Sequence, residues 1–207
     1  MLNVAGVMLA AAFATMTALH VLQPELSPTE EPISFYIHGA HGWVLTVSLA
    51  SFGASAVALS AYFVGTTINS IVSWFTGFGA GMLIDAAVRS DPWFPWESAA
   101  SLSGMVHAAA AIMAPPLLLV PMTRYHRMLK SRAQRIISAV LIMAYFGALL
   151  ASSVSMVVGF ARDIAPPLIG AAERGLAMAA VLWMTLLLRT ARASLAPQPV
   201  CANRNAH

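Results

Sequence analysis

Residues 42–63 read GWVLTVSLASFGASAVALSAYF, an apolar run with no charged side chain and no histidine. About 20 consecutive, mainly apolar residues are enough to cross the hydrocarbon layer of a membrane as an α-helix. Five further runs of this kind follow the same rule, at 2–22, 68–88, 102–122, 136–160 and 167–188. The sequence therefore predicts an all-α fold, a polytopic bundle of about six transmembrane helices.

The composition supports the same conclusion. Of the 207 residues, 59% are hydrophobic and only 9% are charged, whereas a soluble domain carries about 25% charged residues. A soluble enzyme, a nucleic-acid-binding module and a secreted disulfide scaffold are thereby excluded, the last also because Cys201 is the single cysteine. We expect one transmembrane domain at 1–190 and a short cytoplasmic tail at 191–207.

The distribution of charge predicts the orientation. Eight of the eleven basic residues lie in the connection 123–135 or near the C-terminus, and all eight acidic residues lie in or near the other connections. By the positive-inside rule, the basic loop and both termini are expected in the cytoplasm of a bacterial cell and the acidic loops in the periplasm. We therefore interpret the net charge of +3 as the excess of basic residues that orients the protein in the inner membrane. We expect no nucleic-acid partner.

The first run, 2–22, also has features of a secretory signal peptide, because Ala12-Phe13-Ala14 resembles a cleavage site. It lacks the basic residues that precede such signals, and its apolar run is longer than theirs. We therefore expect the helix to be retained.

Ionisable residues within the predicted helices gather near the acidic loops. Asp85, His107 and Glu173 lie within the outer third of their helices, and Ser103 shares a helix face with His107 because the two are four residues apart. Imidazole and carboxylate together form either an acid–base pair or a divalent metal site. The candidate catalytic residues are therefore Asp85, His107, Ser103 and Glu173.

The same chemistry gives candidate metal ligands. They are His107 and Asp85, together with His38 and His41, which are three residues apart just before the second helix. Hydrogen bonding between helices is the alternative interpretation for each histidine, and an Asp85–Arg89 ion pair is the alternative for the carboxylate. The stripes of small residues in the third and fourth helices indicate close helix packing, and Pro115-Pro116 predicts a kink or break.

Several of these stretches resemble a known family. Glu31-Pro32-Ile33-Ser34-Phe35-Tyr36, Gly79-Ala80-Gly81 and Ser103-Gly104-Met105-Val106-His107 are similar to motifs of the family catalogued as domain of unknown function 998. These are bacterial and archaeal membrane proteins of about six helices. The resemblance implies the architecture, points to the Asp91 loop and His107 as distinctive polar positions, and implies no activity.

A remoter similarity concerns seven-helix membrane amidases of the ceramidase and adiponectin-receptor type, which bind zinc through histidines near one membrane face. Ser34 or Ser103, Asp85 and His107 would be the corresponding residues. The chain departs from that pattern, since it has six predicted helices and no His-x3-His pair in the last one.

These observations predict an accessory or structural membrane protein that binds membrane lipids or other membrane-protein subunits. The alternative is an intramembrane metal-dependent hydrolase or lipid-modifying enzyme with its site near the outer face. A third hypothesis is a small transporter or a haem-binding electron carrier, in which His20 would pair with His107. The sequence identifies no cofactor.

Overall fold

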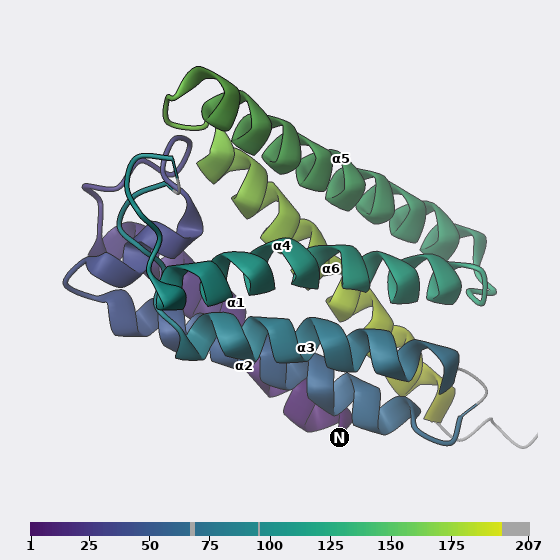
Figure 1. Ribbon diagram of the computed structural model, residues 1–207. Helices are drawn as coiled ribbons and strands as arrows, with labels where there is room; N and C mark the ends of the chain where they lie inside the picture. The colour runs from purple at the N-terminus through teal and green to yellow at the C-terminus, as the bar shows by residue number, and fades with distance from the viewer. Residues whose placement is uncertain (67–68, 95, 196–207) are drawn as a thin grey trace, which may run out of the picture.

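In the computed structural model, which describes residues 1–66, 69–94 and 96–195, the chain is a bundle of long helices (Figure 1). The elements, in chain order, are α1 (Leu2–Leu22), the 3-10 helix η1 (Ile33–His38), α2 (Gly42–Phe63), the 3-10 helix η2 (Asn69–Ile71), α3 (Val72–Ala87), α4 (Leu102–His126), α5 (Arg132–Arg162) and α6 (Ile169–Leu195). No strand occurs within these ranges. The predicted all-α fold is confirmed.

Six helices are long and apolar enough to span a membrane, in the order the sequence predicted. The bounds of α1 and α2 agree with the prediction, whereas α4, α5 and α6 extend further toward the basic residues. Most of the predicted basic loop 123–135 is therefore helical, and only 127–131 connects α4 to α5. Positions 67–68, 95 and 196–207 lie outside the described residues, and with them the start of the third predicted run, Cys201 and most of the predicted tail.

Glycines on α3 allow two neighbouring helices to approach closely. A Cβ atom on Gly79 would lie 2.9 Å from the carbonyl oxygen of Gly53 on α2. Conversely, a Cβ atom on Gly53 would lie 2.7 Å from the carbonyl oxygen of Gly79. On another face, a Cβ on Gly81 would lie 2.5 Å from the side chain of Ala114 on α4. The predicted packing role is confirmed for Gly79 and Gly81 of the third helix, where small residues let the helices approach closely. In the predicted stripe of the fourth helix, Ala111 is exposed.

The prolines of α4 do not break the helix. It runs from Leu102 to His126 through Pro115, Pro116 and Pro121, although each proline removes one backbone hydrogen bond. The hydroxyl of Tyr145 on α5 donates to the carbonyl oxygen of Pro115 at 2.9 Å. A side-chain donor from a neighbouring helix thus contributes to the polar contacts around the prolines, as membrane helices permit.

The last helix crosses behind α4 in the view of Figure 1 and packs against α5 and α1, while α5 lies at the edge of the bundle. Trp183 on α6 is 1% exposed and contacts the rings of Phe75 and Tyr125. Its indole N–H donates to the hydroxyl of Ser138 at 3.3 Å. Trp183 therefore joins α6 to α3, α4 and α5.

Both ends of the helical chain lie at the same end of the bundle. The Arg192 guanidinium on α6 donates to the carbonyl oxygen of Leu2 at 3.0 Å. The opposite end of the bundle, which we call the acidic end, is formed by the connections 23–41, 88–101 and 163–168. There the hydroxyl of Ser90 donates to the carbonyl oxygen of Ser34. Which end faces the cytoplasm stays a prediction.

Candidate functional site

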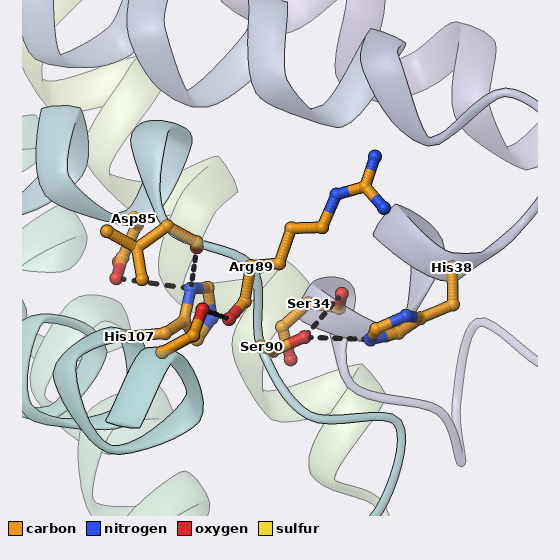
Figure 2. Close-up of polar contacts among 8 residues, drawn as sticks. Ser34, His38, Asp85, Arg89, Ser90 and His107 are labelled. Atoms are coloured by element: carbon orange, nitrogen blue, oxygen red, sulfur yellow. Dashed lines mark hydrogen bonds and ion pairs between the residues drawn. The ribbon is translucent and has the colours of Figure 1, made fainter. Parts of the chain in front are cut away.

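Two polar clusters lie at the acidic end, and the first joins α3 to α4 (Figure 2). Asp85, 3% exposed, and His107, 6% exposed, approach each other with 3.6 Å between Asp85 Oδ1 and His107 Nδ1. The same Nδ1 lies 3.0 Å from the carbonyl oxygen of Val88, the residue that ends α3. The sequence correctly placed Asp85 and His107 as neighbours on adjacent helices.

This geometry defines the tautomer of His107. A carbonyl oxygen only accepts hydrogen bonds, so Nδ1 carries a proton and donates it to Val88. Asp85 faces that same protonated nitrogen. A metal ion bound through Nε2 of His107 would therefore lie on the side of the ring away from Asp85, and as placed the two side chains do not converge on one ion.

Ser103, a candidate catalytic residue from the sequence, is engaged elsewhere. Its hydroxyl donates to the carbonyl oxygen of Arg89 at 2.7 Å (Figure 2). Within the described residues, no hydrogen bond joins Ser103 to His107. The Arg89 side chain is exposed and points away from Asp85, so the alternative Asp85–Arg89 ion pair is absent here. The cluster holds the C-terminal end of α3 against the first turns of α4.

The other predicted residues lie apart from this pair. Glu173 on α6 accepts a hydrogen bond from the backbone N–H of Ile33 at 2.6 Å, and so anchors η1. His38 donates from Nε2 to the Ser90 hydroxyl at 3.2 Å, because that hydroxyl uses its own proton on Ser34. His41 precedes α2 without a side-chain capping bond.

The predicted His38–His41 pair does not lie on one helical turn, because η1 ends at His38 and Gly39 is extended. Nor do the described residues contain a group of three or more His, Cys, Asp and Glu side chains placed to hold a metal. The catalytic and metal roles of these residues remain predictions.

The loop that follows α3 is held by Asp91. Its carboxylate accepts hydrogen bonds from the hydroxyl of Ser101 at 2.6 Å and from the amide of Ser101 at 2.9 Å. Ser101 in turn caps α4, accepting from the amide of Gly104 at 2.9 Å. The hydroxyl of Ser101, followed by its amide, holds the pKa of Asp91 below its usual value of 3.8.

The second cluster surrounds Arg174 near the start of α6. Arg174 Nε donates to His20 Nε2 on α1 at 2.7 Å, and Nη1 donates to the carbonyl oxygens of Glu31 at 3.0 Å and Gly170 at 2.9 Å. The guanidinium also lies over the ring of Tyr36, 5.2 Å from its centroid. Nη2 is buried and has no hydrogen-bond partner.

Arg174 and His20 lie beside a cavity of about 290 Å³ between α1, α2 and α6. Its lining is mostly apolar and includes Phe13, Phe52 and Met178; the remaining lining residues are Ala12, Met16, Thr17, Ile33, Ser48, Leu49, Ala177 and Val181. The cavity is close to the lower end of the usual range for small-molecule sites, about 300–1,000 Å³.

This cavity was not predicted from the sequence. The sequence does contain two features that relate to the cavity: the small residues Ala12 and Ala177, and a cationic residue inside an apolar run. Helix periodicity alone does not show that these residues of α1 and α6 face one space, because that depends on how the two helices cross.

Comparison with known proteins gives one match. A family model described as "Protein of unknown function (DUF998)" covers residues 4–190. No curated protein and no solved structure matches the chain.

We predict that His107→Ala lowers the free energy of unfolding by about 1–3 kcal/mol, because it removes the donor to the buried carbonyl oxygen of Val88. His107→Asn should cost less, since the asparagine side-chain amide can replace Nδ1–H. Reversible unfolding of the purified protein in mixed detergent micelles measures both. Equal losses for the two variants would contradict a hydrogen-bonding role for Nδ1.

For Asp91 we predict a pH-dependent contribution to stability. Because its pKa is lowered on folding, its hydrogen bonds stabilise the protein above the unfolded value of 3.8 and lose that effect as the pH falls through the lower folded value. Asp91→Asn should therefore lower the unfolding temperature at about pH 6 and leave it nearly unchanged at about pH 2. A difference between wild type and variant that is the same at both pH values would contradict this account.

Proposed function

This chain belongs to the protein family of unknown function DUF998, and we propose that it serves as a non-enzymatic, lipid-binding accessory protein of the membrane. In this proposal, one hydrocarbon chain of a lipid occupies the cavity between α1, α2 and α6. The observation that carries it is the cavity itself, which combines an apolar interior with a polar end at Arg174 and His20. A lipid has the same two-part chemistry.

The polar side chains of the lining support an apolar occupant. Ser48 donates its hydroxyl proton to the carbonyl oxygen of Ala12 at 2.9 Å, and Thr17 donates to that of Phe13 at 2.8 Å. His20 uses both ring nitrogens, Nδ1 on the carbonyl oxygen of Met16 and Nε2 on Arg174. These hydroxyl and imidazole donors already have acceptors within the protein. They therefore do not require water or a polar ligand in the body of the cavity.

The engagement of His20 also bears on the haem hypothesis. Its two ring nitrogens are 2.9 Å and 2.7 Å from protein partners on α1 and α6. Neither is free to ligate a haem iron in this arrangement, so we do not propose a haem carrier.

The cavity lies where a lipid of the surrounding bilayer can enter. Phe13 on α1 is 43% exposed and Met178 on α6 is 45% exposed, and both line it. Exposed apolar side chains within membrane-spanning helices face lipid. Entry would therefore be lateral, between α1 and α6, without passage through the loops.

The glycines favour lipid over a protein as the principal partner. The sequence offered the small-residue faces as surfaces for another subunit, but Gly53, Gly79 and Gly81 all pack within this chain, between α2, α3 and α4. The glycine face of α3 is therefore occupied, whereas Ala111 in the small-residue stripe of α4 is exposed. A protein partner would have to use other surfaces, such as the lipid-facing side of α5.

We predict that the protein, purified in mild detergent, retains about one lipid per chain, and that Ala177→Phe abolishes this retention by filling the cavity. Native mass spectrometry measures the bound lipid directly. The matched control is Ala14→Phe, which adds the same ring to α1 at an exposed position outside the lining.

The control should retain lipid at the wild-type level, and both variants should elute as folded protein. Equal lipid retention by wild type and Ala177→Phe would contradict the proposal, and so would a wild-type protein that carries no lipid under conditions in which it stays folded.

A further inference from the structure

We infer that the lipid bound in this cavity carries an anionic headgroup, a carboxylate or a phosphate, and that Nη2 of Arg174 binds its oxygen. This inference rests on the proposed function and adds the chemical class of the ligand. It is based on the hydrogen bonds that the side chain of Arg174 makes within the protein.

A guanidinium carries five N–H groups, one on Nε and two on each terminal nitrogen. In Arg174 the Nε–H donates to His20, and the Nη1 group donates to the carbonyl oxygens of Glu31 and Gly170. The two N–H groups of Nη2 remain, and this nitrogen is buried without a partner. Buried donors of native proteins nearly always have an acceptor, so Nη2 is the part of the Arg174 guanidinium that a ligand can still engage, once the side chains that cover it in this structure move aside.

Arg174 also has no direct ion pair within the described residues, although the neighbouring Glu173 lies near enough for an electrostatic interaction. The partners of Arg174 within the described residues are two carbonyl oxygens, the ring of Tyr36 and His20, and His20 is neutral because its Nδ1–H goes to Met16 and its Nε2 accepts. The adjacent carboxylate, Glu173, accepts from the backbone of Ile33, and no ion pair within 4.0 Å joins it to Arg174 in the described structure. A partly buried cation without a direct ion pair favours an anionic ligand.

The guanidinium is held in place before any ligand arrives. Three hydrogen bonds and the contact with Tyr36 fix its plane from α1, η1 and α6. His20 is a positioning residue in this scheme, since it acts on the headgroup only through Arg174. A pre-organised donor loses little side-chain freedom when the oxyanion binds.

The depth of Arg174 agrees with a headgroup position. It lies near the start of α6, beside the connections of the acidic end, while Val181 at the other end of the cavity lies seven residues deeper. Seven residues of helix span about 10 Å. The headgroup would therefore lie toward the membrane surface and the hydrocarbon chain would extend toward the bilayer centre.

The experiment compares three probes with the same chain: tetradecanoate, tetradecyl phosphate and tetradecanol. Their equilibrium binding to the delipidated full-length protein is measured in detergent. Wild type should bind at least one of the anionic probes about tenfold or more tightly than the alcohol, because a hydrogen bond to a charged group is worth at least that factor. Preference for tetradecanoate identifies a fatty-acid type of ligand, and preference for tetradecyl phosphate identifies a phosphate headgroup.

Arg174→Gln should reduce the affinity for the anionic probes to that for tetradecanol and leave tetradecanol binding nearly unchanged. Arg174→Lys, which keeps the charge, should retain part of the preference. The matched control is Arg192→Gln, because Arg192 also donates to a backbone carbonyl oxygen but lies at the other end of α6, outside the lining. It should keep the wild-type preference.

Equal affinities of wild type for all three probes would overturn the inference, whether or not the variants fold, while leaving the proposed lipid binding intact. An anionic preference that survives unchanged in a folded Arg174→Gln protein would overturn it as well. Failure of wild type to bind any of the three probes would contradict the proposed function itself.

Discussion

The constraint on which this structure depends is that polar groups inside a membrane must find partners within the protein. The helices satisfy their own backbones, and side-chain hydroxyls return their protons to backbone carbonyl oxygens, as Ser48 and Ser55 do between α2 and α1. His107 completes the end of α3 by donating to Val88. Against this background a buried donor without a partner stands out, and Arg174 Nη2 is such a donor.

The two clusters at the acidic end differ in what lies beside them. In the first, His107 and Ser103 donate to carbonyl oxygens at the end of α3, and this arrangement joins two helices. In the second, Arg174 has donors left over and lies beside an apolar cavity. Asp85 Oδ1 of the first cluster is likewise buried without a hydrogen-bond partner, so what distinguishes the second cluster is the apolar cavity that Arg174 and His20 line. This contrast is why the proposed function centres on α1, α2 and α6.

Much of the fold follows from the sequence. Hydrophobic length alone locates all six helices, and the glycines of α3 correctly indicate close packing. The prolines of α4 were harder to interpret, because the sequence alone does not show whether a helix continues through them, as α4 does. The neighbourhood of Asp85 and His107 was predictable since their helices are consecutive and both residues lie near the shared connection.

The cavity was not predictable in the same way. Its lining comes from α1, α2 and α6, which include the first and the last of the described helices, and no local pattern shows how α1 and α6 cross. The engagement of Glu173 by η1 is another long-range contact, joining residues 140 positions apart. The sequence therefore predicted the ionisable residues and the approach of Asp85 to His107, but not the long-range contacts of Glu173 and Arg174.

The central claim is that the space beside Arg174 belongs to a lipid, and an experimental density map of the protein in membrane-derived nanodiscs tests it most directly. The account predicts an elongated density along Phe13 and Met178 that ends within hydrogen-bonding distance of Arg174 Nη2. A map in which α1 and α6 close the space, with Nη2 paired to a group of the protein such as the Glu173 carboxylate, would contradict it.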